Sequence, residues 1–542
     1  MDQRLLTCTS PYMQKMEDRL ISLQQRLDRI RDLMEAELLK GPSRDKDLVE
    51  SYKSAEERLM DEVKILESQG AKVTRDQGLS EFWSQLATVK IDNATRVMEL
   101  PQLPKQLLAF MPPVERLYVR KCYDVLSDVV IAGEEKDILV TGTPGTGKSC
   151  WQFHLLQRLA GLGCTVVLDW ANSDGVRVLF SPEGAFVGSR DSFKQQLLDP
   201  NNFFLVDGQL PVGAVARRVE TTSPKHSLLH RFLKDGADER IMPPWTLEEL
   251  EAAAPLFPNV SRAKMHELFD MWGGSVRWVL ARANSPINEE YLVRAIDRTD
   301  LHALKLAADR SDAAKEVSNV LIHHIPNAQL RLSHVAMASR YVSDMVVKKL
   351  LKSYELELRN FLAASTGEGQ LGVVRGNLFE SFVHQVLPKG GKFTVRYLDS
   401  ESEGEEEVVD VPSGEPCTFE DIKEVASLPD GCHCRPKSKV FQSVDFLRQP
   451  NDIGQVTQNL QHAPAQSARI REWFEVLRAG KETPPGPVYL TYVVPPEIFK
   501  NLKEIRLKGP LDKTKYPLRH RVMKMPFMRA GALAYRPIRF CG

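Results

Sequence analysis

A glycine-rich segment between an apolar run and a helical pattern constrains the fold of this chain most. It reads Gly-Thr-Pro-Gly-Thr-Gly-Lys-Ser over 142–149, a full G-x-x-x-x-G-K-S motif. The apolar run at 137–140 predicts a buried strand, and the pattern over 148–162 predicts a helix. A strand, a glycine-rich turn and a helix in this order predict an α/β unit with a phosphate-binding loop.

Each residue type in this segment suits a nucleoside triphosphate and its Mg²⁺ ion. Glycines let the backbone turn N–H groups toward phosphate oxygens, and the helix that begins there adds a positive dipole. The Lys is expected to hold the β- and γ-phosphates, and the Ser hydroxyl to hold Mg²⁺. The residues expected to bind ATP or GTP are Gly142, Thr143, Pro144, Gly145, Thr146, Gly147, Lys148 and Ser149.

Three residues farther along the chain are expected to complete this site. Asp207 ends the apolar run 203–206, so we expect a strand that brings this acid to the Mg²⁺ ion. Gly208 follows it where many ATPases place Glu, which favours nucleotide binding over fast hydrolysis. Ser223 ends the next expected strand with Thr222 and is expected to sense the γ-phosphate. Arg277 opens a helix and is expected to reach the phosphates from a lid; the alternative is a surface salt bridge.

The length of 542 residues is too great for one hydrophobic core, so we expect about three or four domains. Strands alternating with helices between 116 and 300 predict a parallel sheet in an α/β layer. The pattern from 284 to 365 predicts helices only, and a mixed α/β region follows. The expected domains are a helical hairpin or coiled coil (1–75), an α/β nucleotide-binding domain with a helical lid (76–300), a helical, winged-helix-like connector (301–365) and a C-terminal α/β domain (366–542).

The N-terminal helices carry a short apolar seam. Residues at positions 16, 20, 23, 27, 30 and 34 alternate in steps of four and three, as in a coiled coil of about three heptads. A second charged helix follows a Gly-Pro break at 41–42. One interpretation is a coiled-coil hairpin that forms a homo-oligomer. The other is a hairpin that packs on its own chain, and the seam is too short to decide between them.

Composition excludes some classes of protein. Lys plus Arg equals Asp plus Glu at 72 each, so overall charge identifies no partner. No apolar run reaches the length of a membrane helix, and the first residues lack the apolar core of a secretory signal. The spacing of Cys417, Cys432, His433 and Cys434 fits a zinc site poorly, because zinc ligands usually come as two pairs. We therefore expect reduced thiols and no membrane partner.

Several segments together resemble a known family. The chain resembles the ATPase module of the Crinkler effectors and the related retrotransposon hot spot proteins, which are similar to ATPases of the AAA+ type. The resemblance covers about 80 to 500 and is more specific in its ordered set of segments than in the glycine-rich motif. The segments are 117–123, 142–149, 203–208, 221–224, 242–250, 272–280, 337–343, 376–387, 390–398, 436–447, 455–462 and 492–499.

The resemblance implies that the C-terminal module has a restriction-endonuclease-like fold, which cuts DNA with carboxylate-held metal ions. Carried onto this sequence, Glu380 is the helix acid, Asp445 the metal-binding strand acid, and Gln455 the residue on the next strand. Thr457 stands where the family pattern usually has Lys, which puts strong catalysis in doubt. By spacing alone Glu380 and Asp445 are ordinary carboxylates. The apolar residues around Asp445 mildly favour a functional acid, because burying an unpaired carboxylate is costly.

These observations lead to three functional hypotheses. The first is a nucleotide-gated nuclease in which an ATPase module controls DNA cleavage, and the second is a catalytically weak nuclease fold that binds nucleic acid or protein. The third is a signalling ATPase that oligomerises through its N-terminal helices. The stretch 500–529 carries ten Lys or Arg against two acids, which favours DNA as the partner; a solvated basic strand pair is the alternative.

The expected location is the nucleus, either of the cell that makes the protein or of a host after secretion. The leader that the Crinkler resemblance would imply is absent at the N-terminus, where the helical hairpin stands instead. A resident, transposon-derived protein is therefore the alternative to an exported effector.

Overall fold

The fold was described from a computed structural model. The described residues are 11–40, 45–69, 73–104, 107, 114–171, 173, 175–224, 226–309, 320–353, 355–363, 371–399, 403–437, 444–460, 466–479, 486–503, 507–512 and 514–526, without the side chains of 11–21, 63–69 and 226–229. Parts of the basic stretch 500–529 lie outside the described residues. Part of the apolar seam predicted for the N-terminal helices lies outside the described side chains. The chain forms two compact units, one of Met1–Thr141, Gly147–Ser223 and Ser227–Arg240, the other of Gly142–Thr146, Pro224–His226 and Ile241–Gly542.

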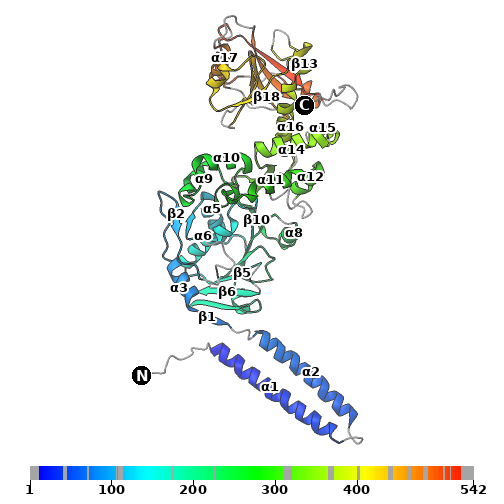
Figure 1. The fold of residues 1–542 in the computed structure, drawn as a ribbon. Helices are drawn as coiled ribbons and strands as arrows, with labels where there is room; N and C mark the ends of the chain where they lie inside the picture. The colour runs from blue at the N-terminus through cyan, green and yellow to red at the C-terminus, as the bar shows by residue number, and fades with distance from the viewer. Residues whose placement is uncertain are drawn as a thin grey trace. The chain divides into compact units, whose positions relative to one another are not determined.

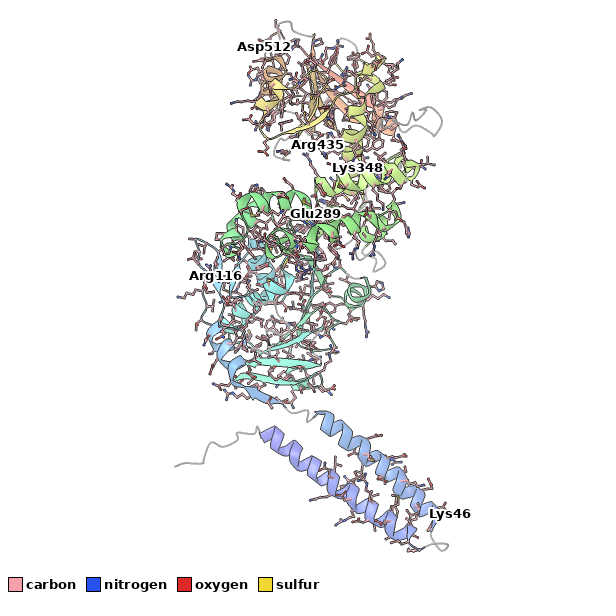
Figure 2. All side chains as sticks on the ribbon, viewed as in Figure 1. Lys46, Arg116, Glu289, Lys348, Arg435 and Asp512 are labelled. Carbon is pink, nitrogen blue, oxygen red and sulfur yellow. The ribbon has the colours of Figure 1, made fainter. Side chains whose placement is uncertain are left out.

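The N-terminal helices α1 (Pro11–Leu38) and α2 (Lys46–Gln69) pack side by side as a hairpin (Figure 1). Their contact is made by buried Leu23, Leu27 and Leu59, so part of the predicted seam faces the second helix of the same chain. Leu39 remains 81% exposed. Packing within the chain is thus observed, and oligomerisation through these helices stays a prediction. Figure 2 shows the described side chains, with Lys46 at the start of α2.

An eight-stranded sheet forms the centre of the first unit, in the order β1-β7-β6-β5-β8-β9-β4-β10 among the described strands. The neighbours β5–β8, β8–β9 and β9–β4 are parallel, and β4 and β5 are buried along their whole length, as expected for apolar strands covered on both faces. The strands are β1 (Thr74–Asp76), β4 (Asp137–Thr141), β5 (Val166–Trp170), β6 (Val176–Ser181), β7 (Gly184–Ser189), β8 (Phe203–Asp207), β9 (Arg217–Thr221) and β10 (Asp238–Ile241).

The prediction of a parallel sheet is therefore right for the centre and wrong for one side. There β1, β6 and β7 pair antiparallel with their neighbours. Only two residues separate β6 from β7, and so short a connection returns the chain antiparallel. The remaining elements around this sheet are α3 (Gln77–Leu86), β2 (Val97–Glu99), β3 (Arg116–Tyr118), α5 (Lys121–Ala132), α6 (Lys148–Gly161), α7 (Lys194–Leu197) and α8 (His226–Lys234).

The segment predicted to contain only helices includes a β hairpin. Its strands β11 (Ile322–Pro326) and β12 (Leu332–Met337) pair antiparallel, and the Asn327 side chain accepts hydrogen bonds from the turn. The expectation was wrong here because Pro326 and Asn327 are turn residues between two short apolar runs. The surrounding helices are α9 (Leu247–Ala253), η2 (Ala254–Leu256), α10 (Arg262–Trp272), η3 (Arg277–Ala281), α11 (Ile287–Asp297), α12 (Leu301–Ala308), α14 (Arg340–Ser353) and α15 (Glu355–Ala363).

The C-terminal part holds a second sheet, mixed in direction, with the described strand order β14-β13-β20-β19-β18-β17-β16-β15. Helix α17 covers it through Ile470, Trp473 and Leu477, which join Leu490 and other strand residues in one buried core. The elements are α16 (Gly372–Val386), η5 (Leu387–Lys389), β13 (Gly391–Tyr397), β14 (Glu406–Val411), β15 (Pro416–Phe419), η6 (Ile422–Ser427), β16 (His433–Pro436), β17 (Phe446–Arg448), β18 (Asp452–Val456), α17 (Ser467–Arg478), β19 (Val488–Val494), α18 (Pro496–Phe499) and β20 (Leu518–Lys524).

The chain as a whole is thus a mixed α/β protein with several sheets, which agrees with the fold class predicted at its coarsest level. Among the described helices, none combines the length and apolar character needed to cross a bilayer.

Candidate functional site

The glycine-rich segment joins the end of β4 to the start of α6, as predicted. Gly142, Gly145 and Gly147 have φ angles of 131°, 81° and 101°, a region that favours glycine over residues with a side chain. Gly147 is also in close contact with α5, because the Tyr123 hydroxyl donates a hydrogen bond to its carbonyl oxygen at 3.0 Å. The segment is therefore a tight turn whose glycines are required by backbone conformation and by space.

Two residues predicted to hold Mg²⁺ lie together in the first unit. The Ser149 hydroxyl, in the first turn of α6, donates to Asp207 Oδ2 at 2.8 Å, and the Thr221 hydroxyl donates to Asp207 Oδ1 at 2.7 Å. Burial raises the pKa of Asp207, while these two hydrogen bonds and the charge of Lys148 oppose the rise. A partly buried carboxylate beside a hydroxyl and an ammonium group is suited to a hydrated divalent cation.

Thr221, whose hydroxyl binds Asp207, was not singled out from the sequence. The role predicted for Ser223, sensing the γ-phosphate, stays a prediction. Strand β9 lies between β8 and β4 and ends at Thr221, so this residue comes level with Asp207. Gln152 of α6 donates to the Thr221 hydroxyl at 2.7 Å and fixes it. Ser223 lies two residues beyond the strand. The available signal was a hydroxyl residue, Thr221, at the end of the next strand in the sequence after Asp207.

The second unit contains the loop residues Gly142–Thr146 and the segment that packs on them. Ser275 Oγ donates to Pro144 O at 3.3 Å, and Arg277 N donates to Gly145 O at 3.3 Å. A Cβ atom on Gly145 would lie 2.6 Å from Ser275 Oγ. The predicted residue Arg277 thus has its backbone against the loop and an exposed side chain. The backbone of Arg277 contacts the loop at Gly145, and the reach of its side chain to a phosphate stays a prediction.

A chain of contacts inside the second unit runs from this loop to helix α16. His324 N of β11 donates to Thr143 Oγ1 at 3.0 Å. Strand β12 pairs with β11, and Met337 N at its end donates to Asn377 Oδ1 of α16 at 3.2 Å. Asn377 lies one turn before Glu380 on the same helix face. The β11–β12 hairpin is therefore hydrogen-bonded at one side to the loop and at the other to the helix of a predicted catalytic acid.

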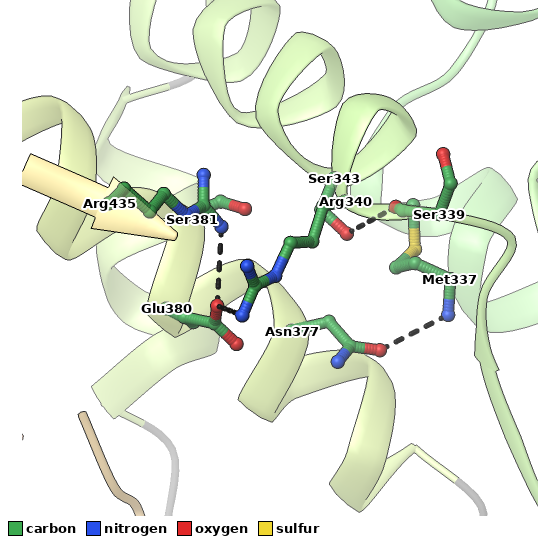
Figure 3. A pocket seen from close by; sticks show the side chains of 8 residues that line it. All are labelled: Met337, Ser339, Arg340, Ser343, Asn377, Glu380, Ser381 and Arg435. Atoms are coloured by element: carbon green, nitrogen blue, oxygen red, sulfur yellow. Dashed lines mark hydrogen bonds and ion pairs between the residues drawn. The ribbon is translucent and has the colours of Figure 1, made fainter. Parts of the chain in front are cut away.

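Glu380 is held by two arginines (Figure 3). Its Oε1 atom lies 3.3 Å from Arg340 Nη2 and 3.2 Å from Arg435 Nη2. Arg435 also binds Asp344 of α14 at 2.7 Å. Glu380, Arg340 and Arg435 line a small polar cavity of about 10 Å³. Ser381 also lines it, and its hydroxyl is buried without a hydrogen-bond partner. A cavity of this size has room for about one water molecule.

Asp445, Gln455 and Thr457 lie on or beside neighbouring strands, as predicted. Asp445 directly precedes β17, and its Oδ2 accepts a hydrogen bond from Val456 N of β18 at 2.7 Å. Gln455 is a buried residue of β18. Thr457 follows it, and its hydroxyl accepts from Asn459 N at 3.0 Å, so it closes a turn. Burial lowers the pKa of Arg340, whereas Glu380 and Asp445 both act to raise it. Both predicted acids thus act electrostatically on Arg340, which Glu380 contacts directly.

A buried histidine pair, which the sequence interpretation missed, adjoins this group. His384 Nδ1 of α16 and His433 Nε2 of β16 are 3.0 Å apart, and His384 Nε2 lies 4.0 Å from Glu380 Oε1. Burial lowers the pKa of His433 to about 3 and that of His384 well below its usual value. Both rings are therefore neutral near pH 7. The spacing of four residues between Glu380 and His384 was the signal that put them on one helix face.

The cysteines near His433 lie on the paired strands β15 and β16, where Cys417 is in register with Cys434. Burial raises the pKa of the Cys432 and Cys434 thiols, which disfavours the thiolates that metal ions bind. Within the described residues, His, Cys, Asp and Glu side chains form no group of three or more placed to hold a metal ion.

Comparison with known proteins found similarity to two curated proteins of Phytophthora infestans. The chain is 26% identical over 345 residues to Crinkler effector protein 15, and 27% identical over 345 residues to Crinkler effector protein 16. Each match covers 60% of this chain and 54% or 53% of the relative, so the chain spans about half the length of the curated relatives it matches. No family model matches the chain. The similarity supports the predicted relationship to the Crinkler effectors.

Proposed function

We propose that the chain binds a nucleoside triphosphate, ATP or GTP, with Mg²⁺ at the turn Gly142–Ser149. The observation that carries the proposal is the 2.8 Å hydrogen bond between Ser149 and Asp207, formed beside Lys148 where α6 begins. The helix start and the glycine turn offer N–H groups to phosphate oxygens, and Lys148 adds a positive charge. Asp207 and Ser149 are the oxygen donors for the metal.

The residues present fit a Mg²⁺ ion. A hydroxyl and a carboxylate within hydrogen-bonding distance are hard oxygen ligands, and Asp207 is a partly buried acid whose charged form a cation would stabilise. When bound, the ion would neutralise part of the triphosphate charge. The protein residues orient it: Thr221 fixes Asp207, and Gln152 fixes Thr221. Gly208 offers no side chain after Asp207, so we propose slow rather than fast hydrolysis.

A direct binding measurement tests this proposal. Fluorescent ATP and GTP analogues would be titrated into the full chain with Mg²⁺ or with EDTA. The variants are Lys148→Ala and the control Lys194→Ala, at an exposed lysine of the same unit. We expect saturable, Mg²⁺-dependent binding that Lys148→Ala weakens at least about tenfold, because a lost ionic hydrogen bond costs roughly 1.5–3 kcal/mol. Equal affinity of the Lys148→Ala variant and wild type would remove the loop as the binding site.

The second candidate function is a nucleotide-gated nuclease, in which the C-terminal module cuts DNA. Its support is the ion pair of Glu380 with Arg340, on which Asp445 also acts electrostatically, together with the hairpin contacts that link Thr143 to Asn377. The present arrangement does not fit a catalytic metal, because Glu380 is already paired with two arginines and Thr457 supplies no ammonium group. We therefore derive no metal-dependent step, and a binding module built on the same residues is the alternative.

Plasmid DNA separates these alternatives. Wild type, Asp445→Asn and Lys148→Ala would be incubated with supercoiled DNA and Mg²⁺ or Mn²⁺, with and without ATP. Nicking that Asp445→Asn abolishes supports the nuclease, and dependence on Lys148 supports gating by nucleotide. Salt-sensitive DNA binding without nicking supports the binding module instead. We extend the proposal to an effector role, because the two relatives are named as effector proteins.

A further inference from the structure

A cleft of about 370 Å³ opens in the C-terminal module, away from the predicted catalytic residues. It is bounded by the end of β14, the turn between β17 and β18, and residues of β19 and β20. Arg448 and Asp452 are opposite each other in the strand register, at the turn that joins β17 to β18. Asp445 and Gln455 lie at the other end of the same two strands. Asp452 and Gln455 are three positions apart along the strand, which corresponds to roughly 10 Å. The cleft is therefore a site of its own, with the volume of a small-molecule pocket.

Two buried arginines line this cleft. Arg448 is 7% exposed and Arg521 is 6% exposed. Arg521 is neutralised by Asp452, which accepts from its Nη2 at 2.5 Å, and its Nε donates to the Thr491 hydroxyl. Among the residues that the structure describes, none places a carboxylate within ion-pair distance of Arg448, and its side chain makes one hydrogen bond to them, from Nη2 to Pro412 O at 2.7 Å. A guanidinium group has five N–H donors, so most of those on Arg448 are unused.

A buried amide in the same lining gives an independent sign of a missing ligand. Gln449 is 2% exposed, its Nε2 donates to Val425 O at 2.8 Å, and its Oε1 is buried without a hydrogen-bond partner. Buried polar atoms without partners are uncommon in native proteins and call for a ligand or water. The rest of the lining is mixed: Val409, Val411 and the prolines are apolar, while the acids Asp410 and Asp430 are exposed.

We propose that this cleft binds a small organic anion whose oxyanion group pairs with Arg448. Asp452 lies near enough to act on Arg448 electrostatically but does not contact it. A buried guanidinium without a directly bound anion is costly to maintain, and a carboxylate or phosphate group would satisfy it with paired hydrogen bonds. The apolar residues would contact the organic part of the ligand. The acids at the rim repel a long polyanion, so the site suits a small molecule rather than nucleic acid. The proposal stands independently of nucleotide binding at the glycine-rich turn.

The test uses the full chain with Lys148→Ala, which weakens anion binding at the glycine-rich turn. Phenyl phosphate, benzoate and inorganic phosphate would be titrated calorimetrically into this protein and into versions that also carry Arg448→Gln or Arg469→Gln. Arg469 is an exposed arginine of α17 outside the cleft and serves as the matched control. We expect saturable binding that Arg448→Gln weakens at least about tenfold and Arg469→Gln leaves unchanged.

The choice of ligands distinguishes a phosphate ester from a carboxylate, and one more variant, Asp410→Asn, tests the cleft independently of Arg448. Tighter binding of phenyl phosphate than of benzoate identifies a phosphate ester, and the reverse identifies a carboxylate. Asp410→Asn changes only an exposed rim acid and is expected to strengthen anion binding, so it tests the site even if Arg448→Gln fails to fold. The proposal is overturned if no ligand binds saturably, if Asp410→Asn and a folded Arg448→Gln leave affinity unchanged, or if a DNA oligonucleotide displaces phenyl phosphate.

Discussion

Arg340 and Glu380 form an ion pair across the α14–α16 contact, with Nη2 and Oε1 3.3 Å apart. The same carboxylate oxygen receives Arg435 at 3.2 Å, so one acid serves two guanidinium groups. The side chains of Arg340 and Glu380 are each 19% exposed, which limits the help that water gives to either charge. Glu380 therefore has a structural role here, whatever its role in chemistry.

Replacing Glu380 by Gln should destabilise the protein, because two largely buried arginines would lose a shared counter-charge. Arg435 would keep Asp344, so we expect a loss of about 2–3 kcal/mol rather than the full cost of an unpaired buried charge. The matched control is Glu355→Gln, which removes a helix-surface pair with Arg359 and should cost under about 0.5 kcal/mol. Urea unfolding of both variants checks this, and equal midpoints for the two would contradict it.

The buried histidine pair predicts a loss of stability in acid. The folded pKa of His433 is about 3, below its usual value of 6.5, because burial disfavours the charged ring. The unfolded chain therefore binds a proton that the folded chain does not, and stability falls as pH drops from about 6.5 toward 3, by up to about 1.4 kcal/mol per pH unit for each such histidine.

His433→Gln should make the pH dependence of stability shallower by up to this amount for one histidine. The control is His302→Gln, at an exposed position, which should keep the wild-type slope. Denaturant midpoints at several pH values between 4 and 7 give the slopes. An unchanged slope in His433→Gln would show that this histidine is charged in the folded protein.

How far the sequence predicts this molecule depends on the range of the interactions involved. The strand before Gly142, the helix from Lys148 and the strand ending at Asp207 were predictable, because local apolar patterns and one spaced motif define them. The antiparallel side of the first sheet and the β11–β12 hairpin were not. Short apolar runs are ambiguous between helix and strand, and their pairing is decided by distant partners.

The same difference in range separates the two candidate sites. The Ser149–Asp207 contact was predictable, because both residues stand at the ends of recognisable elements. The pairing of Glu380 with Arg340 and Arg435 was not, since three separate segments supply the charges. Arg448 and its cleft gave no signal at all in the sequence, because a buried, unneutralised arginine is defined only by its surroundings.

Gly147→Ala should destabilise the chain more than an alanine at another glycine of positive φ. Gly147 has φ 101°, and a Cβ there would collide with the Tyr123 hydroxyl. Gly163 has φ 68° and open space around its Cβ position, so Gly163→Ala measures backbone strain alone, about 1 kcal/mol. We expect Gly147→Ala to cost at least about 1 kcal/mol more, from the lost packing and hydrogen bond. Tyr123→Phe removes the hydroxyl that the new Cβ would meet. If Gly147→Ala costs as much stability in the Tyr123→Phe background as in wild type, the predicted collision is wrong.

Asp207→Asn should leave the nucleotide-free protein as stable as wild type or more so. Burial raises the pKa of Asp207 in the folded protein above its pKa in the unfolded chain. The folded protein therefore holds this proton more tightly, so ionisation of Asp207 lowers the stability of the fold as pH rises toward 7. The amide removes that charge; its oxygen can accept one of the two hydroxyl hydrogen bonds, and its NH2 group can donate to the other hydroxyl. The rise in melting temperature that Mg²⁺ and ATP give wild type should be lost. Asp191→Asn, at an exposed site, should keep it; a full rise in Asp207→Asn would exclude Asp207 from the metal site.

Asn377→Ala should uncouple helix α16 from the glycine-rich turn without weakening nucleotide binding. Thr143 contacts the β11–β12 hairpin through His324, and the hairpin contacts α16 through Asn377, so nucleotide at the turn can bias both ends of one element. We expect a non-hydrolysable ATP analogue to change amide exchange in α16 of wild type, and not of Asn377→Ala. The control Gln385→Ala removes a bond from the same helix to Asp344 O and should keep the response. A wild-type response in Asn377→Ala would show that the hairpin hydrogen bond does not carry the coupling.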